Sequence, residues 1–452
     1  MSAIDAMTAD PDDPTTFAKK QRFMLRMVTV LVGGMFLDGY ILGIIGPVAH
    51  SIEEDPSFTA LWIGLEAASA MIGILIGSPI GGWLADKFGR KPILFWDLAL
   101  FTVFSALQFF VPSDVPWVLF VVRLLMGLAV GIEYAVGWPM LAEFAPTAKR
   151  GRYLCYTLVA WYGGFMVAFF IGYYMDAADI RWQYILGTST LIAFVLLLGR
   201  IGLPESPRWL WSQGRTEEAH AIVTEYLDTE YRTDMAKAAS DGVRGTFKML
   251  FSPAVWRSTV FMSVFWMCAV APFFAIGTFA DRIMGEVGLT GLLKGVIFSV
   301  AGWVGTIVTT MVIDKFSRRK LTVPTQWIAS VILAVAALLI WFWTDANQWL
   351  LLVLFLAYAF LSAIYNTMTT VYPAEVFPTE VRAIGTGFAA AISRMGAAAG
   401  LFLTPEAIKV LGLGPTLLVW AFVGVVGALV SQILAPETSG KSLSELAGDV
   451  SH

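Results

Sequence analysis

The chain is poor in charge, cysteine and histidine. Charged residues make up 14% of its 452 residues, whereas a soluble globular protein carries about 25%. The two cysteines, Cys155 and Cys268, lie inside apolar stretches, which excludes a disulfide framework and a cysteine-based metal site. The three histidines lie outside the apolar cores, so neither a histidine metal site nor a histidine proton relay is expected at His50, His220 or His452.

The residue sets of an enzyme or a nucleic-acid-binding protein are missing as well. The formal net charge of −4 is small, which argues against a nucleic-acid partner. We find no nucleophile–base set, metal cluster or phosphate-binding loop, so neither an enzyme nor a resident cofactor is expected. Residues 1–22 are polar and acidic before they turn basic. The apolar run that follows is too long for the core of a signal peptide.

Apolar residues, by contrast, are abundant and occur in long stretches. They make up 57% of the chain, and a helix needs roughly 20 residues to cross the hydrocarbon core of a bilayer. The pattern predicts an all-α membrane protein with twelve transmembrane helices in two pseudo-symmetric six-helix bundles. The predicted spans are near 24–47, 61–84, 92–111, 117–142, 153–174, 183–202, 256–280, 292–313, 321–343, 348–371, 384–404 and 414–434.

A polar stretch, 203–255, separates the first six spans from the last six, and helical spacing within it predicts a short amphipathic helix. The expected division is a tail at 1–23, bundles at 24–202 and 256–435 around this linker, and a tail at 436–452. Lysine and arginine favour the loops that face the cytoplasm. Of the 30 such residues, Arg123 and Arg394 fall within spans, and one set of alternate loops holds only Arg181, Arg282, Lys294 and Lys409. We therefore expect a multi-pass protein of the cell (plasma or inner) membrane with both termini in the cytoplasm.

The chain also repeats itself at an offset of roughly 230 residues. GWLADKFGRK ends at Lys91 and MVIDKFSRRK ends at Lys320, while EFAPTAKRGR is matched by EVFPTEVRAIGT and LPESPRWL by APETSGKSL. The anchor pairs are separated by 228, 232 and 232 residues at Asp86/Asp314, Glu143/Glu375 and Pro204/Pro436. A duplicated hydrophobic unit is a common plan of secondary transporters, in which the substrate lies between the two halves.

These motifs resemble those of the major facilitator superfamily, and in particular its sugar-porter and organic-ion-transporter branch of metabolite–proton symporters. GWLADKFGRK between the second and third spans, LPESPRWL after the sixth and PETSGKSL after the twelfth carry the resemblance, which covers residues 24–446. It implies a twelve-helix transporter that needs no cofactor and uses a proton gradient. Its expected partners are a small-molecule substrate, protons and the lipid bilayer, and we expect a monomer.

Charged residues cluster at the predicted cytoplasmic ends of the helices. Acids and bases at helix ends can pair, and pairs that break in another conformation bias a two-state equilibrium. The resemblance implies that the network closes the cytoplasmic side when the transporter faces outward. The candidate gating residues are Asp86, Arg90, Lys91, Glu143 and Arg150 in the first half and Asp314, Arg318, Glu375 and Arg382 in the second. The alternative is positive-inside charge without a gating role.

Some charged residues fall inside the predicted spans, where charge is costly and usually functional. Proton-coupled members of the resembled family pair an aspartate of the first helix with an arginine of the fourth. Arg123 lies where the sugar porters keep that arginine, whereas Asp38 lies about one turn from the aspartate position. With no histidine available, Asp38 and Glu133 are the leading proton carriers, with Arg123 as the partner. The alternative is a static ion pair between the first and fourth helices. Glu66 is interpreted as solvated or packing, and Asp97 as facing the gate.

The features specific to hexose transport are missing, since Met267 to Phe274 replaces the glutamine pair of the sugar porters. Arg394 lies in an S-R-x-G context that resembles the organic-anion and aromatic-acid branches, and a guanidinium is a two-pronged donor for a carboxylate. The alternative is that Arg394 pairs only with protein oxygens. The remaining candidate substrate-binding residues are Trp161, Tyr162, Trp266, Phe273, Phe274, Tyr365 and Asn366.

The sequence therefore favours a proton-coupled symporter of a small organic anion. The alternative is a transporter of a neutral polyol or sugar-like solute, although the missing glutamine pair argues against hexoses. Drug efflux is less favoured because the motifs are those of sugar porters. A sensor built on a transporter scaffold normally carries a long extra cytoplasmic domain, whereas 15 residues follow Glu437.

Overall fold

A computed structural model describes residues 14–53, 57–145, 149–227, 246–278, 283, 293–343, 347–378 and 381–439. Within these ranges the chain forms helices joined by turns and short loops, without a strand. Eleven of the described helices are long and apolar enough to cross a membrane. The eighth predicted span is occupied by helix α13 (Leu293–Val312), whose apolar part is Ile297–Val312. The predicted all-α membrane fold is confirmed.

Each predicted span corresponds to one helix or to two consecutive helices. The first bundle contains α1 (Pro14–Glu53), α2 (Ala60–Phe88), α3 (Arg90–Leu107) with η2 (Gln108–Phe110), α4 (Pro116–Phe144), α5 (Arg150–Asp176), α6 (Trp182–Gly187) and α7 (Ser189–Arg200). The second bundle contains α11 (Trp256–Thr278), α13, α14 (Arg318–Phe342), α15 (Gln348–Val376), α16 (Arg382–Leu411) and α17 (Leu413–Leu434). Between them lie α8 (Pro207–Ser212), α9 (Thr216–Tyr226) and η4 (Phe247–Phe251).

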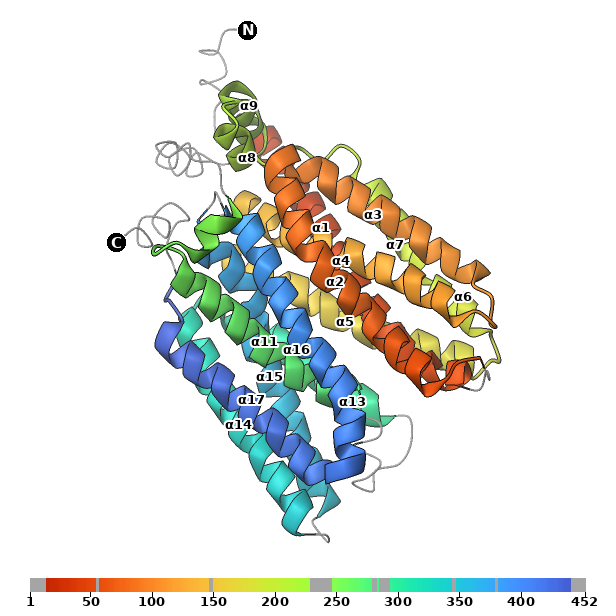
Figure 1. Cartoon of the computed structure of the whole chain (residues 1–452). Coiled ribbons are helices and arrows are strands. Elements are labelled where there is room, and N and C mark those ends of the chain that lie inside the picture. The colour runs from red at the N-terminus through yellow and green to blue at the C-terminus, as the bar shows by residue number, and fades with distance from the viewer. Residues whose placement is uncertain are drawn as a thin grey trace.

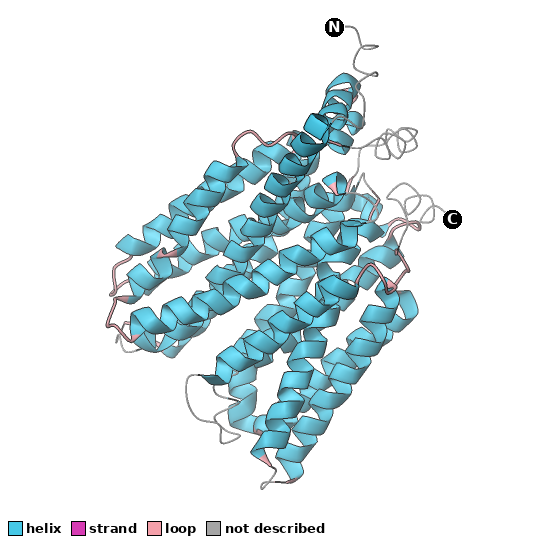
Figure 2. Ribbon diagram, turned by 180° about the vertical axis from the view of Figure 1, so that it is seen from behind, coloured by secondary structure: helices cyan, strands magenta, loops and turns pink. Residues whose placement is uncertain are grey.

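The two bundles are inclined to each other and approach most closely at one end (Figure 1). This end, which carries the start of α1 together with α8 and α9, is called the terminal face. The view from behind shows the same arrangement (Figure 2). Helices α2 and α16 pack together on one side of the interface between the bundles, and α5 and α13 pack together on the other.

Glycine permits the close approach of α2 and α16. A Cβ atom added to Gly82 would lie 2.6 Å from the carbonyl oxygen of Ala383, and one added to Gly387 would lie 2.4 Å from that of Ser78. Small residues let helix backbones approach in a membrane, where no hydrophobic force draws helices together. The two bundles therefore meet backbone against backbone along this pair of helices.

The helices differ in how much of their apolar surface the protein itself covers. Only 33% of the apolar window of α3 and of α14 is buried, compared with 78% in α11. Apolar side chains that the protein leaves uncovered suit contact with lipid tails, because lipid tails are as apolar as these side chains. Helices α3 and α14 therefore lie at the periphery, and α11 lies at the centre next to the opposite bundle.

Helix α1 begins ten residues earlier than the predicted span, at Pro14 instead of residue 24. The extension is polar and basic, so hydropathy alone does not detect it. It is held by the amphipathic helix of the linker, because the rings of Phe23 and Tyr226 lie 4.2 Å apart between centroids and Lys19 forms an ion pair of 2.8 Å with Glu225.

Candidate transport site and latch

A buried carboxylate at the end of α4 joins the two bundles at the terminal face. Glu143 is fully buried and forms an ion pair with Arg90, the first residue of α3. Its other oxygen lies 3.3 Å from the guanidinium of Arg382, the first residue of α16 in the opposite bundle. The hydroxyl of Ser206 donates a further hydrogen bond to the Glu143 oxygen that pairs with Arg90.

The second half repeats this arrangement. Glu375 near the end of α15 lies 3.4 Å from Arg318 of its own bundle and 3.4 Å from Arg150 of the first bundle. The hydroxyl of Thr438 donates a hydrogen bond of 2.5 Å to the second carboxylate oxygen. The sequence repeat relates each member to its counterpart, so the duplicated motifs form two copies of one charge cluster, with one arginine of each cluster crossing the interface.

Two more acids of the repeat contact the opposite bundle. Asp86 accepts a hydrogen bond of 3.3 Å from the backbone N–H of Ile384 at the start of α16. Asp314 forms an ion pair of 2.7 Å with Arg152 near the start of α5. We call the latch the set of charged residues at this end, namely Asp86, Arg90, Glu143, Arg150, Arg152, Asp314, Arg318, Glu375 and Arg382.

Lys91, which we expected among the gating residues, contributes differently. Its side chain is exposed, and its backbone N–H donates to Glu205. Glu205 also accepts from the backbone N–H of Arg90 at 3.0 Å, and Glu437 accepts in the same way from Arg318 at 3.1 Å. Glu205 and Glu437 are the acids of the repeated motifs LPESPRWL and APETSGKSL. They cap α3 and α14, the helices that begin with Arg90 and Arg318, because the first backbone N–H groups of a helix have no partner within it.

The two capping acids differ in their electrostatic surroundings. Burial raises the pKa of Glu205, although backbone N–H groups of Ser206, Arg90 and Lys91 oppose that effect. Burial also acts to raise the pKa of Glu437, but hydrogen bonds from the Ser317 hydroxyl and from three backbone N–H groups outweigh it and lower the pKa. Glu437 is thus the cap better held in its charged form.

A second charge cluster lies among α3, α4 and α7. One guanidinium nitrogen of Arg200 lies 2.6 Å from both carboxylate oxygens of Glu133, and the other lies 2.9 Å from Asp97. All three side chains are at most 5% exposed. The expectation that Asp97 faces the gate is wrong, since its carboxylate contacts Arg200 of α7 and interacts with Glu133.

Asp38 of α1 completes this cluster. Its carboxyl group interacts electrostatically with Glu133, Arg200 and Arg394, and its Oδ2 atom has no hydrogen-bond partner among the described residues. A cavity of about 10 Å³ lies beside it, lined in part by Asp97 and Glu133. That volume is close to the minimum that a single water molecule occupies.

Arg123 does not join Asp38 and Glu133, contrary to the prediction that groups them. The guanidinium is buried toward the other end of α4, and the carboxyl group with which it interacts is that of Glu66 on α2. Glu66 is only 2% exposed, so of the two interpretations of this residue, solvated or packing, the first is wrong. Sequence position gives the depth of a charge along a helix, but it leaves open which neighbouring helix the side chain faces.

Arg394 of α16 lies between the bundles and is 4% exposed. Its guanidinium carbon is 5.4 Å from the ring centroid of Tyr134 on α4 and 5.8 Å from that of Phe274 on α11. Its Nε donates to the hydroxyl of Ser393, and no ion pair to it lies within the described ranges. Within the described ranges Arg394 therefore has a protein oxygen, that of Ser393, as a hydrogen-bond partner, but no carboxylate in an ion pair.

Aromatic side chains from both bundles surround this position. Trp161 and Tyr162 of α5 contact Phe273 of α11 with centroids 6.2 and 5.4 Å apart. Trp138 stacks on Tyr134 at 4.9 Å and contacts Trp266 at 5.3 Å. The structure thus brings together the predicted Trp161, Tyr162, Trp266, Phe273, Phe274 and Arg394.

The two predicted residues of α15 lie buried in the same bundle as Arg394. Tyr365 is 2% exposed and Asn366 is 5% exposed. The amide Nδ2 of Asn366 has no hydrogen-bond partner among the described residues. A buried amide without a partner is costly, so Asn366 is a candidate donor to a polar group of the substrate.

Sequence reasoning missed Tyr134, Trp138 and Arg200. Tyr134 and Trp138 are four residues apart, so they share a helix face, and this spacing next to Glu133 was a usable signal. Arg200 ends α7 and resembles an ordinary loop cation in the sequence. Within the described ranges no group of His, Cys, Asp and Glu side chains is arranged to hold a metal ion.

Comparison with known proteins places the chain in a family. The profile described as "Sugar (and other) transporter" matches residues 26–449. The chain belongs to this family. It is therefore a membrane transporter and not an enzyme, and the expected resemblance to sugar porters of the major facilitator superfamily is confirmed.

The names of the relatives range from metabolite transporters in general to transporters of one solute. The inner membrane metabolite transport protein YgcS of Escherichia coli (strain K12) is 34% identical over 93% of both chains. The arabinose-proton symporter of Bacillus subtilis (strain 168) is 27% identical over 97% of both chains. The niacin transporter NiaP of Acinetobacter baylyi is 24% identical over 94% of this chain and 97% of its own. The family therefore includes transporters named for different solutes.

Solved structures show the same fold. The proton:xylose symporter XylE with bound 6-bromo-6-deoxy-D-glucose has a TM-score of 0.86 at 21% identity, covering 95% of this chain and 99% of its own. The inward-open form of the xylose transporter XylE from E. coli has a lower TM-score of 0.69, over 94% and 99%. The arrangement of the two bundles is therefore closer to the first of these structures.

Proposed function

We propose that this chain carries a small organic anion, in symport with protons, across the cell membrane by alternating access. The observation that carries the proposal is Arg394, a buried guanidinium that aromatic rings of both bundles flank and that interacts electrostatically with Asp38. A guanidinium at membrane depth needs a partner, and it binds a carboxylate through two parallel hydrogen bonds. The aromatic rings would hold the flat or apolar body of the anion.

The charge count near Arg394 supports coupling to one proton. Asp38, Asp97 and Glu133 bring three carboxyl groups to the two guanidiniums of Arg200 and Arg394. Full ionisation would leave one negative charge uncompensated at membrane depth, and one proton balances it. A substrate carboxylate would pair with the guanidinium of Arg394, so less positive charge would remain to balance the carboxylate of Asp38. Substrate binding and protonation of Asp38 therefore favour each other, since linkage is reciprocal.

The latch supports alternating access. We propose that both termini lie in the cytoplasm and that the structure is the conformer closed on that side. Four contacts of the latch cross the interface at the terminal face and join Arg382 to Glu143, Arg150 to Glu375, Arg152 to Asp314 and Ile384 to Asp86. We also propose that the transporter acts as a monomer, because both halves of the site come from one chain.

Removal of a latch contact should open the cytoplasmic side. Arg382→Gln loses the contact with Glu143, which keeps its partner Arg90. A hydrogen bond to a charged group is worth about 1.5–3 kcal/mol, so the equilibrium should shift by roughly ten- to 150-fold. The measurement is thiol labelling of Thr370→Cys, a buried position that contacts α5 through the Leu154 carbonyl, in a chain with Cys155 and Cys268 replaced by serine.

Lys91→Gln is the matched control for the latch test, because the Lys91 side chain is exposed and only its backbone joins the cluster. Labelling should rise in Arg382→Gln and stay unchanged in Lys91→Gln. Equal labelling of the two variants, at normal expression, would mean that these charges set topology and do not close the transporter.

A neutral polyol or sugar-like solute is the second candidate substrate. The amide Nδ2 of Asn366, which has no hydrogen-bond partner in the described part of the chain, supports it. The relative named for arabinose and the structural neighbour named for xylose support it as well. The niacin transporter supports the first candidate, because niacin is an aromatic carboxylic acid. Drug efflux is the least supported of the three.

Dependence on the membrane potential separates the two candidates. One proton and one monocarboxylate move together without net charge, so uptake into proteoliposomes should follow the pH gradient, about tenfold accumulation per unit, and ignore an imposed potential. One proton with a neutral solute moves one charge, so about 2.3 kcal/mol per 100 mV would add roughly 50-fold. Accumulation of a labelled polyol, but of no acid in a panel of carboxylates, would overturn the anion proposal.

A further inference from the structure

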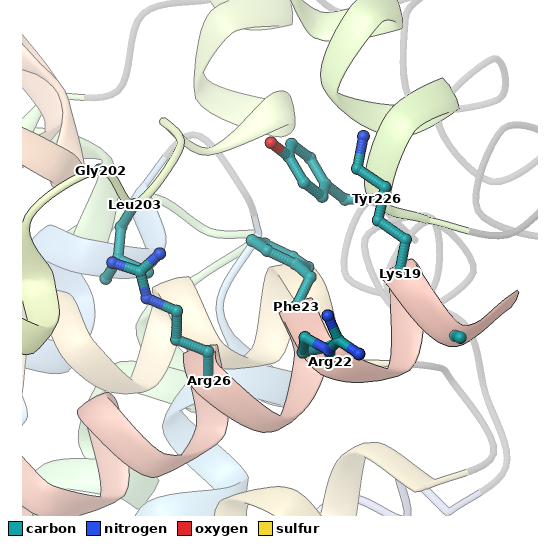
Figure 3. Close-up of a pocket in the computed structure, with 8 residues that line it drawn as sticks. Lys19, Arg22, Phe23, Arg26, Gly202, Leu203 and Tyr226 are labelled. Atoms are coloured by element: carbon teal, nitrogen blue, oxygen red, sulfur yellow. The ribbon is translucent and has the colours of Figure 1, made fainter. Parts of the chain in front are cut away.

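A cavity lined with positive charge lies at the terminal face, outside the transport site. Its volume is about 510 Å³, and α1, α9 and the turn after α7 form its walls. Lys19, Arg22 and Arg26 come from successive turns of α1 and therefore share one helix face. Figure 3 shows Phe23 between them, with Arg26 and Leu203 on one side and Lys19 on the other.

The three cations are not neutralised to the same degree. Lys19 forms an ion pair of 2.8 Å with Glu225 of α9. Arg26 donates to the backbone carbonyls of Gly199 and Ile201, which fixes its guanidinium without removing its charge. Arg22 is exposed, and no hydrogen bond or ion pair to its side chain is found among the described residues. The cavity thus retains two guanidiniums that lack a carboxylate partner within the described part of the chain.

The surroundings of the cavity suit a lipid better than a soluble anion. Leu25, one turn from Arg22, is 68% exposed, and Ile201 and Leu198 beside Arg26 are 55% and 51% exposed. Large apolar side chains on this surface match acyl chains, and guanidiniums next to them match a phosphate group at the membrane surface. Basic pockets on the cytoplasmic side of membrane helices bind anionic lipid headgroups.

We infer that this cavity binds the phosphate group of an anionic phospholipid of the cytoplasmic leaflet. The assignment rests on the proposed orientation, which places the terminal face at that leaflet. The phosphate would accept hydrogen bonds from Arg22 and Arg26, and the acyl chains would follow Leu25 and Leu198. Such a lipid would contact both the start of α1 and the turn after α7 that precedes Glu205.

Lipid binding to the purified full-length protein in detergent tests this inference, and the assay needs neither transport nor a defined orientation. Native mass spectrometry should detect tighter binding of phosphatidylglycerol than of phosphatidylcholine with the same acyl chains. Arg22→Gln should weaken phosphatidylglycerol binding about fivefold, since each basic residue near anionic lipid contributes on that scale. Arg22→Gln with Lys19→Gln should weaken it further.

Arg257→Gln is the matched control, because Arg257 is an exposed arginine near the start of α11 and does not line the cavity. An equal loss of phosphatidylglycerol binding in Arg257→Gln and Arg22→Gln would overturn the assignment to this cavity. Thermal stabilisation is measured with millimolar inorganic phosphate and with phosphatidylglycerol. If inorganic phosphate stabilises the protein as much as phosphatidylglycerol does, the lipid assignment is overturned in favour of a soluble anion. Loss of transport with retained lipid preference would contradict the proposed function alone.

Discussion

Asp38→Asn should abolish proton-driven accumulation while leaving exchange of substrate across the membrane measurable. Asparagine keeps the shape of the side chain but cannot give up or accept the coupling proton. The Oδ2 atom of Asp38 has no hydrogen-bond partner among the described residues, so the substitution breaks no observed hydrogen bond at that atom. With a pH gradient of one unit, the accumulation ratio should fall from about ten to one. Counterflow, which needs no net proton movement, should persist in the same proteoliposomes.

Glu133→Gln tests the other proposed carrier, with a different structural risk. It breaks the bidentate contact with Arg200, and removal of one partner of a buried ion pair costs about 3–5 kcal/mol. Its thermal stability must therefore be measured together with its transport. Full accumulation by both variants would exclude Asp38 and Glu133 as carriers. Glu66→Gln is the control. Loss of accumulation in that variant alone would assign proton coupling to the pair of Glu66 and Arg123.

The helix order and most residues of the latch were predicted from sequence, with Lys91 wrongly included and Arg152 missed, whereas the pairing within the latch was not predictable. The repeated motifs place arginines at the first residues of helices and acids at the last turns. Arg150 stands seven residues after Glu143 in the chain, yet it pairs with Glu375 of the other bundle. Pairing across an interface depends on how two bundles dock, and one sequence contains no direct measure of that.

The inner charge cluster could have been predicted in part. The buried residues of α3 include Arg90, Leu94, Asp97 and Phe101, and their spacing of three or four places them on one helix face. That pattern assigns Asp97 to the protein interior. The partner Arg200 is harder to predict, since a basic residue at the end of a span also fits the positive-inside rule.

Arg394→Ala should cause the largest loss of substrate binding of any single change in the transport site. A guanidinium buried to 96% that interacts with Asp38 has few ways to offset its charge, and a substrate carboxylate is one. Truncation of one partner of a buried, hydrogen-bonded charge pair costs about 2–5 kcal/mol, which is a loss of affinity of roughly 30- to 5,000-fold. Calorimetry on the purified protein measures this loss for a carboxylate ligand of the uptake panel.

The loss of affinity for an acid, compared with the loss for a neutral ligand, decides whether Arg394 contacts substrate or only supports the fold. Arg394→Lys keeps the charge but loses the planar donor pair, so it should retain part of the affinity for the acid. A neutral amide of the same shape should bind Arg394→Ala nearly as well as it binds the parent chain, because it never used the charge. If acid and amide lose affinity by the same factor, the arginine is structural. The neutral solute would then become the better substrate candidate, with Asn366 as its donor.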